Sequence, residues 1–282
     1  MKNNYISVIV PTYNEGENII DCLQSLGNQT YSDFEIIIVD DGSTDSTVSR
    51  LKRLEKIVEE IRLLRQRHRG PGAARNLGCK LARGNILVFV DADMTFDRDF
   101  LKDLVRPIIK GKSKGTFSKN EYVSNWTNAW ARCWNINEGW QEKKRHPENY
   151  PDKQKVFRAI LKSEFKRVGG FTPGGYTDDY SLAEKLGYGA DAAEGALFYH
   201  QNPDTLKEVY IQAKWAAKRR YKLGIIGFII ALLRTTFPFS IYQGISKALK
   251  YKEPAFIPFK LVYDTGTHWG VIEYLLKGKE IK

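Results

Sequence analysis

Carboxylates occur in this sequence as pairs that suit metal binding and proton transfer. Asp91 and Asp93 stand two residues apart, directly after the apolar run 86–90, so both side chains can point to one side of an extended chain. Asp178 and Asp179 form a second pair after the glycine-rich stretch 169–175. Mg²⁺ and Mn²⁺ bind one or two carboxylates together with substrate phosphates. A carboxylate can also deprotonate an attacking hydroxyl.

Each pair also has a structural interpretation. Asp91 and Asp93 can be surface residues that end a strand, and Asp178 with Asp179 can be an acidic helix N-terminus, which the helix dipole favours. For the second pair the sequence pattern leaves both interpretations open. For Asp91 and Asp93 a metal site is favoured, because polar and acidic sequence also follows two other apolar runs.

These two runs, residues 6–10 and 34–39, are short and rich in β-branched residues, as buried strands are. The first leads into Pro11-Thr12-Tyr13-Asn14-Glu15 and the second into Asp40-Asp41-Gly42-Ser43-Thr44-Asp45. Helical patterns at 17–26 and 47–60 separate the runs, and this β-α-β-α order predicts a doubly wound, mainly parallel α/β sheet flanked by helices. Ligands in such sheets bind beyond the carboxyl ends of the strands. Three acidic strand ends at one rim therefore predict a site for a metal and a nucleotide.

Composition, cysteine spacing and the N-terminal sequence indicate the cellular compartment. A chain of 282 residues that is 42% hydrophobic can bury a large core without disulfides. Cys22, Cys79 and Cys133 are far apart and show no metal-ligand spacing, so we expect reduced thiols. No signal peptide precedes the first apolar run, so we expect the active domain to stay inside the cell.

The basic charge lies mostly in the C-terminal part. Residues 205–282 hold 14 Lys and Arg against 5 Asp and Glu, which is +9 of the formal net charge of +11. Arg234 and Pro238 interrupt the apolar stretch 223–233 before the roughly 20 residues that a spanning helix needs. Basic residues and interfacial aromatics surround this stretch: Lys218, Arg219, Arg220, Lys222, Lys247, Trp215, Phe237, Phe239, Tyr242 and Trp269.

This combination is typical of helices that lie in a membrane interface and bind anionic headgroups. The alternative is a helical hairpin packed on the domain, with its charge solvated. We therefore expect residues 1–204 to form the catalytic domain, with a nucleotide-binding half (1–110) and an acceptor-binding half (111–204), and residues 205–282 to form a helical, membrane-associating segment. In the acceptor half, Trp126, Trp130 and Trp134 have the spacing of one helix face, which either packs into a core or lines an acceptor groove.

The motifs together resemble glycosyltransferase family 2, whose members are inverting enzymes with the GT-A fold. The resemblance runs in order across about the first 200 residues. It rests on residues 7–15, 39–45, 72–78 (Gly-Ala-Ala-Arg-Asn-Leu-Gly), 91–93, 168–171 (Val-Gly-Gly-Phe) and 178–182 (Asp-Asp-Tyr-Ser-Leu).

The resemblance implies a role for each matching position. The positions that match the family's nucleotide-binding elements are Pro11, Tyr13 and Glu15 in the first turn, Asp40 as the acid that binds the base, Asp41 and Ser43 beside it, Arg69, Gly70, Arg75 and Asn76 in the loop and helix start near the ribose and diphosphate, and Asp91 with Ala92. Asp93 matches the main metal ligand, with Asp91 and His200 as further candidates for Mn²⁺ or Mg²⁺. Asp179 matches the catalytic base, and Asp178 replaces the family's usual Glu.

We therefore expect transfer of a sugar from a nucleotide-diphosphate sugar, with inversion and assisted by a metal. UDP-sugars are the first choice of donor, and the alternative is a GDP-mannose-dependent polyprenyl phosphate mannosyltransferase. Processive relatives carry Gln-x-x-Arg-Trp, whereas residues 212–215 read Gln-Ala-Lys-Trp, which favours transfer of a single sugar. A membrane-held enzyme would meet a glycan or lipid-linked acceptor at the cytoplasmic face of the cell membrane, bound there as a peripheral or monotopic protein.

Two other classes of protein fit the sequence less well. A nucleotidyltransferase would need a glycine-rich loop after the first strand, where this chain has Pro-Thr-Tyr-Asn-Glu. A non-catalytic basic protein that binds nucleic acid would explain the charge, but no helix-turn-helix, zinc or aromatic-basic RNA motif is present. We expect no nucleic-acid partner.

Overall fold

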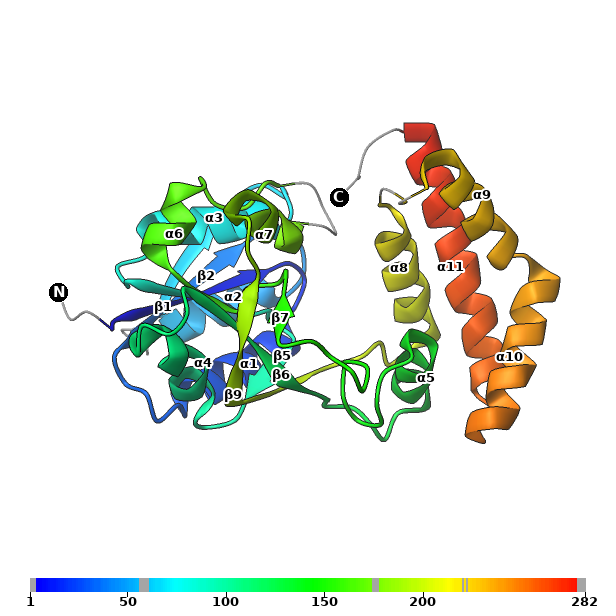
Figure 1. Ribbon diagram of the computed structural model, residues 1–282, viewed down its shortest axis with the longest axis horizontal. Coiled ribbons are helices and arrows are strands. Elements are labelled where there is room, and N and C mark those ends of the chain that lie inside the picture. Colours follow the sequence, from blue (N-terminus) through cyan, green and yellow to red (C-terminus); the bar gives the residue numbers. More distant parts are fainter. Residues whose placement is uncertain (1–3, 56–60, 174–177, 220, 222, 278–282) are drawn as a thin grey trace. The chain divides into compact units, whose positions relative to one another are not determined.

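The computed structural model describes residues 4–55, 61–173, 178–219, 221 and 223–277 (Figure 1). The chain forms two compact units: a sheet unit, residues 1–121 and 150–200, and a helical unit, residues 122–149 and 201–282. Residues 122–149, which the sequence analysis assigns to an acceptor half, thus belong to the same unit as the C-terminal helices. Residues 174–177 of the predicted glycine-rich turn, and Arg220 and Lys222 of the basic cluster, lie outside the described residues.

The first half of the sheet is parallel. β1 (Ile6–Thr12) lies between β2 (Phe34–Asp40) and β4 (Ile86–Phe89), and β3 (Ile61–Arg65) extends the sheet beyond β2. The predicted runs 6–10, 34–39 and 86–90 correspond to β1, β2 and β4. β3 is not predicted from the sequence, because Arg62 and Arg65 break up its apolar pattern.

The second half of the sheet is antiparallel, so the sheet is mixed and not mainly parallel. After β4 the strand order continues β8-β6-β9-β5, and β7 pairs with β9 outside this path. These strands are β5 (Met94–Phe96), β6 (Gly115–Val123), β7 (Lys153–Gln154), β8 (Ala159–Leu161) and β9 (Ala190–His200). β8 pairs with β4 and β6, and β9 pairs with β5, all antiparallel.

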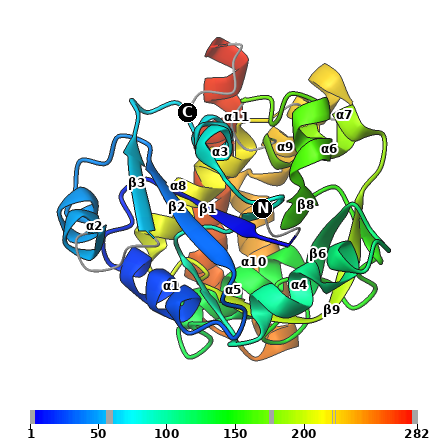
Figure 2. The same cartoon turned by 90° about the vertical axis from the view of Figure 1, so that its left-hand side faces the viewer.

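Helices cover both faces of the sheet (Figure 2). One face carries α1 (Asn18–Gly27), α2 (Thr47–Glu55) and α4 (Phe100–Ile109), and the other carries α3 (Pro71–Leu81), α6 (Lys162–Arg167) and α7 (Ser181–Leu186). Alternate residues of β1 supply the two cores: Val8 packs toward α1 and α4, whereas Ile9 packs toward α3. Buried apolar residues on both faces explain why the first strands read as continuous apolar runs.

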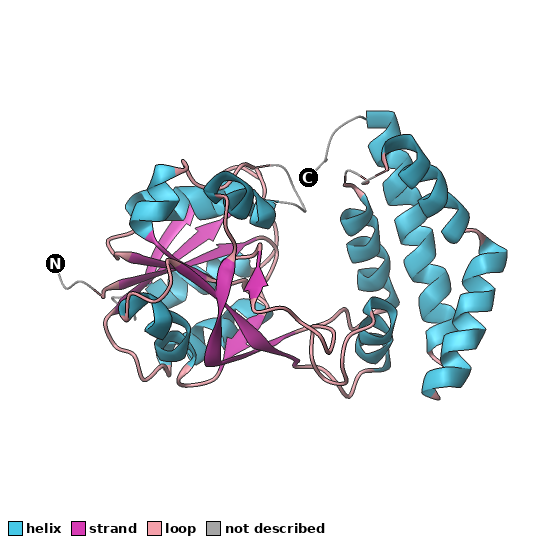
Figure 3. Cartoon of the chain, in the orientation of Figure 1, coloured by secondary structure: helices cyan, strands magenta, loops and turns pink. Residues whose placement is uncertain are grey.

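The helical unit is built from α5 (Ala129–Glu138), α8 (Leu206–Ala217), α9 (Gly224–Arg234), α10 (Phe237–Tyr251) and α11 (Phe256–Lys277) (Figure 3). α11 packs against α8 and α10, and its Phe256 and Phe259 are fully buried. Two glycines of α11 allow this approach. A Cβ at Gly266 would lie 2.5 Å from the Tyr210 carbonyl oxygen, and one at Gly270 would lie 2.3 Å from that of Lys214. The predicted helical C-terminal segment is therefore confirmed.

The three tryptophans do not share one helix. α5 begins at Ala129, so Trp126 precedes it, and the prediction of a single face with three tryptophans is wrong. Trp134 is buried and packs edge-on against Tyr263, with ring centroids 5.4 Å apart, and Trp130 packs partly buried against the same cluster. For these two residues the core interpretation is correct.

Two further predictions concern the helices and the cysteines. Among the described residues no single helix is long and apolar enough to cross a membrane. α9 and α10 pass that test only as a pair, and they meet at a bend of 65°. Cys22, Cys79 and Cys133 are free and buried, as expected.

Candidate active site

The turns after β1 and β2 are tied together at the carboxyl rim of the sheet. Thr12 and Asp40 are partners in the parallel ladder, so both chains leave the sheet at the same level. The Asn14 N–H donates to Ser43 Oγ at 2.9 Å, and the Thr44 N–H donates to Asn14 Oδ1 at 2.9 Å. Asn14 adopts φ 57°, a left-handed conformation that asparagine tolerates. The structure thus brings the two predicted nucleotide-binding turns together.

The two aspartates at the end of β2 shape the adjoining loops. Buried Asp40 accepts the Ser43 N–H at 3.1 Å and binds Arg65 Nε at 3.0 Å. Asp41 accepts the backbone N–H groups of Arg69 and Gly70, at 2.9 and 2.8 Å. Asp41 therefore fixes the loop that precedes α3.

An aromatic pair lies beside this loop. The rings of Tyr13 and His68 stack with centroids 4.1 Å apart, and His68 Nδ1 lies 2.8 Å from Asp41 Oδ2. Tyr13 is 42% exposed, so the pair presents an aromatic surface at the rim. The sequence analysis selected Tyr13 but missed His68, which is 55 residues away in the chain.

Two arginines, the buried Arg75 and the mostly buried Arg158, hold Asp91. Arg75 Nη2 lies 2.7 Å from Asp91 Oδ1, and Arg158 Nη1 lies 3.1 Å from Oδ2. Burial alone would raise the pKa of Asp91, but the charges of Arg75 and Arg158 hold it well below the usual range. Both carboxylate oxygens are thus engaged by guanidinium groups. In this arrangement each carboxylate oxygen of Asp91 faces an arginine and keeps a second lone pair.

Arg75 also connects the two acidic pairs. Its second Nη donates to Asp179, which lies in the short 3₁₀ turn η1 (Asp178–Tyr180). The Arg75 guanidinium also stacks over the Phe171 ring, with 5.6 Å between the guanidinium carbon and the ring centroid. The structure therefore brings Asp179 to Asp91 through one shared arginine. The side chain of Asp178 lies outside the described residues.

Asp93 and His200 meet where β5 and β9 pair. Met94 is opposite His200 in that antiparallel ladder, which places the preceding Asp93 beside the imidazole. His200 Nε2 lies 3.0 Å from Asp93 Oδ2, and Nδ1 lies 2.8 Å from Glu121 Oε1. The structure thus brings together Asp93 and His200, two of the residues predicted as metal ligands, and Glu121 is an addition.

Glu15 adds a further carboxylate to this region. Its pKa is raised to about 7, first by burial and then by the negative charge of Asp93. Asp91 and His200 also act on it electrostatically, so Glu15 lies close to all three groups. Negative charge that the arginines do not compensate is therefore concentrated around Glu15 and Asp93.

These residues fit a hard divalent cation only in part. No cluster of three His, Cys, Asp or Glu within the described part of the chain is arranged to hold a metal. The donor set does suit Mn²⁺ or Mg²⁺, because such ions commonly take one or two protein ligands and complete their shell with phosphate oxygens and water. Asp93, with His200 beside it, fits that role, and the negative charge of Asp93 that helps to raise the pKa of Glu15 would also favour a cation.

The predicted nucleotide residue Asn76 has a structural task. Its side chain donates to the Phe171 carbonyl and accepts the Phe171 N–H, each at 2.9 Å. A Cβ at Gly170 would lie 2.5 Å from Asn76 Oδ1, so only glycine permits this contact. Asn76 therefore anchors the segment after α6 to α3.

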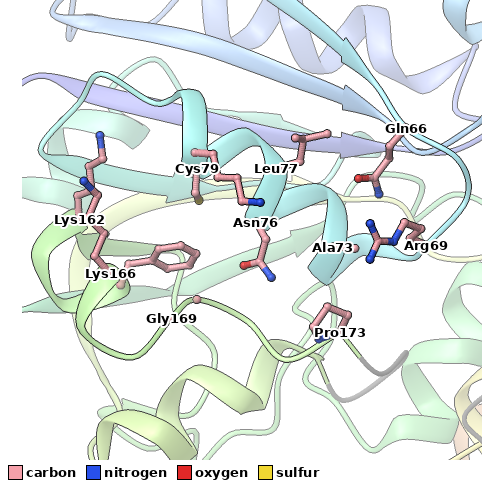
Figure 4. A pocket seen from close by; sticks show the side chains of 13 residues that line it. Gln66, Arg69, Ala73, Asn76, Leu77, Cys79, Lys162, Lys166, Gly169 and Pro173 are labelled. Atoms are coloured by element: carbon pink, nitrogen blue, oxygen red, sulfur yellow. The ribbon is translucent and has the colours of Figure 1, made fainter.

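A pocket of about 480 Å³ lies beside this anchor, between α3 and α6 (Figure 4). Asn76 points into it, and Arg69 lies at one end and Lys166 at the other. Of the predicted nucleotide residues, only Arg69 and Asn76 line this pocket. The acidic residues of the rim do not line it.

Sequence reasoning missed Arg158, Glu121 and His68. Arg158 directly precedes the apolar strand β8, and a charge beside a buried strand is the one local signal that pointed to it. Glu121 and His68 lie in polar stretches that show no such signal. Only the folded chain brings each of them to its partner.

The mixed sheet, its helical layers and the acidic carboxyl rim define the class of GT-A-like α/β proteins. Among solved structures, the mannosyltransferase PcManGT from Pyrobaculum calidifontis, in complex with GDP-Man and Mn²⁺, superposes with a TM-score of 0.60 at 20% identity over 94% of this chain and 87% of that one. S. aureus TarS 1-349 in complex with UDP-GlcNAc gives 0.56 at 18% identity, over 98% and 92% of the two chains. At these identities the likeness concerns the fold.

Sequence comparison identifies the family. The family model described as Glycosyl transferase family 2 matches residues 7–169. The glycosyltransferase YibD of Escherichia coli (strain K12) is 44% identical over 90 residues, which is 32% of this chain and 26% of that protein. A poly(ribitol-phosphate) beta-glucosyltransferase of Bacillus spizizenii is 39% identical over 121 residues, 39% of this chain and 19% of that protein. The chain belongs to glycosyl transferase family 2, and its matches span about a quarter or less of these two relatives.

Proposed function

We propose that this chain transfers a single sugar from a nucleotide-diphosphate sugar to an acceptor hydroxyl, with inversion and with the help of Mn²⁺ or Mg²⁺. The observation that carries the proposal is the Asp91–Arg75–Asp179 connection, which joins the strand-end acidic pair to the candidate base. UDP-sugars are the first choice of donor and GDP-mannose is the second. A TarS structure contains UDP-GlcNAc and the PcManGT structure contains GDP-Man, so neighbours of this fold bind both kinds of donor.

In this reaction the acceptor hydroxyl oxygen attacks the anomeric carbon, the bond from that carbon to the diphosphate oxygen breaks, and the hydroxyl proton passes to Asp179. Arg75 orients Asp179 through its guanidinium, and the Asp91 carboxylate in turn holds Arg75. Tyr13 and His68 offer a surface for the base, and α3, which begins directly after the loop fixed by Asp41, offers the positive end of its helix dipole to the diphosphate. A bound cation would supply positive charge to the leaving diphosphate, with Asp93 and His200 to hold it.

The first test is calorimetric titration of the purified chain with UDP, GDP, UDP-sugars and GDP-mannose, in Mn²⁺ and then in chelator. We expect one nucleotide series to bind, with an affinity at least about tenfold higher in Mn²⁺, because a cation held by Asp93 would supply positive charge to the diphosphate. Binding that is equally tight in chelator would contradict the role of the cation. The absence of binding by any nucleotide would contradict the proposed donor site.

We propose further that α9 and α10 lie in the surface of a membrane at the cytoplasmic face, where a lipid-linked acceptor such as a polyprenyl phosphate would be met. No described side chain of α9 is buried. Ile225, Ile226 and Leu233 are each more than 60% exposed, and so is Phe237 at the start of α10. An exposed apolar face of this extent is typical of an interaction site. The basic residues around it, among them Lys218, Lys250 and Lys252, favour anionic lipid headgroups as the partner.

Replacing Ile225 and Ile229 together by Asp should lower the fraction of protein that binds anionic vesicles by about tenfold or more. Both residues are exposed on one face of α9, so the change removes apolar insertion without opening a core. The measurement is co-sedimentation with phosphatidylcholine vesicles that contain phosphatidylglycerol. A truncation before Leu223 is a less specific test, because it also removes Phe256 and Phe259 from the core of the helical unit.

The matched control is the double change Leu81→Asp and Ile109→Asp. Both residues are about 40% exposed on the sheet unit, so the control adds the same charge outside the helical unit. The control should bind vesicles as the wild type does. Equal binding by all three proteins would contradict membrane docking through α9.

A further inference from the structure

Three strands bring together a row of three polar side chains. Glu121 lies near the end of β6, His200 is the last residue of β9, and Asp93 directly precedes β5. β9 neighbours both β6 and β5 in the sheet, so the imidazole of His200 lies between the two carboxylates. Nδ1 lies 2.8 Å from Glu121 Oε1, and Nε2 lies 3.0 Å from Asp93 Oδ2.

This row of three side chains is largely shielded from water. The side chains of His200, Glu121 and Asp93 are 14%, 20% and 26% exposed. Shielding strengthens hydrogen bonds and makes a misplaced polar group costly, so the ring orientation is well defined. The backbone of β9 fixes the position of the imidazole, but its rotation about the last side-chain bond depends on the partners of the two nitrogens.

Glu121 is suited to fix that rotation. A histidine that presents one nitrogen to a metal almost always donates the N–H of the other nitrogen to a carboxylate, a carbonyl or a water. Here Nδ1 lies against Glu121, whose carboxylate can accept its hydrogen, and Nε2 lies on the side of Asp93. Rotation of the ring by half a turn would break both contacts at once.

We propose that Glu121 is a positioning residue for the cation site. By holding the Nδ1–H of His200, it makes Nε2 and the Asp93 carboxylate converge on one point. Glu121 itself contacts the opposite edge of the ring and is not a ligand in this arrangement. The inference rests on the proposed function, because the cation assists the proposed sugar transfer, but it assigns a task to a residue outside every motif of the sequence analysis.

Mn²⁺ binding to the full chain tests the proposal. The affinity of chelator-treated protein for Mn²⁺, alone and with UDP, is measured by electron paramagnetic resonance titration. Glu121→Ala should weaken Mn²⁺ binding by about 10- to 100-fold, the range found for outer-sphere partners of metal-binding histidines. Glu121→Gln retains an oxygen that accepts the Nδ1–H, so its affinity should stay within about threefold of the wild type.

A double-mutant cycle separates this role from a general structural one. If Glu121 acts through His200, Glu121→Ala should cause no further loss of Mn²⁺ affinity in the His200→Ala background. Glu194→Ala, which removes an exposed carboxylate from β9, is the matched control and should bind Mn²⁺ as the wild type does. Additive losses in the cycle would overturn the proposal.

Nuclear magnetic resonance provides a readout that does not depend on the metal. The chain has only four histidines, so ¹⁵N-labelled imidazole signals can be assigned by single substitutions. Glu121→Ala should change the Nδ1 signal of His200 in metal-free protein, while the His146 and His268 signals stay in place. An unchanged His200 signal, or Mn²⁺ affinity equal to wild type in Glu121→Ala, would overturn the positioning role alone. A wild-type chain that binds no Mn²⁺, even with UDP, would overturn it together with the cation part of the proposed function.

Discussion

Asp179→Asn lowers the rate of sugar transfer by about 1,000-fold and leaves donor affinity within about twofold of the wild type. General bases contribute about 10²- to 10⁴-fold to such reactions, and an amide cannot take the acceptor proton at neutral pH. Asn has nearly the same shape, and its side-chain oxygen can still accept from the Arg75 guanidinium. The arrangement of Arg75 and Asp91 is therefore preserved in the variant.

Two measurements check this result: initial rates of transfer in saturating donor and acceptor, and calorimetric titration with the donor. Asp178→Asn, made in parallel, should retain far more activity, because Asp179 contacts Arg75 and is the proposed base. Near-normal turnover by Asp179→Asn together with a large loss in Asp178→Asn would move the base to Asp178. Similar small losses in both variants would contradict a base in this turn.

Asp93→Ala abolishes the activity that depends on added metal, a loss of about 1,000-fold. The change removes the carboxylate beside His200 and reduces the negative charge around Glu15, so a cation loses both a ligand and its electrostatic attraction. Turnover is measured against Mn²⁺ concentration after treatment with chelator. Higher Mn²⁺ should restore at most a small part of the rate.

Asp97→Asn provides the control for Asp93→Ala. Asp97 is an exposed aspartate four residues further on, just after β5, and its substitution removes one charge without touching His200. Its metal dependence should match the wild type. Full activity of Asp93→Ala in chelator would show that the reaction needs no cation at this position.

The sequence by itself determined three strands of the parallel half of the sheet and the acidic residues that follow them. Apolar β-branched runs are local signals, and each of the runs ending near Val10, Val39 and Val90 corresponds to a strand. Parallel strands flanked by helices bring their carboxyl ends to one edge, so the rim follows from the order of the elements. The motifs around Asp40, Arg75 and Asp91 also identify the family, because their order and spacing are visible without any contact between them.

The tertiary structure decided which residues of the rim pair with one another. Arg158 meets Asp91 across 67 positions of the chain, and Glu121 meets His200 across 79. No periodicity encodes such distances, because they depend on the antiparallel pairing of strands whose connections are irregular. The same pairing made the sheet mixed, and the contacts of 122–149 with the C-terminal helices set the boundary between the two units.

The exposure of α9 also depends on the tertiary structure, although its apolar composition is visible in the sequence. The sequence marks residues 223–233 as apolar but does not tell whether they are covered, since a buried core helix and a membrane-docking helix read alike. In the folded chain α11 packs mainly against α8 and α10, and no described side chain of α9 is buried. Composition is a local property of the chain, whereas burial depends on which distant segment fills the space beside it.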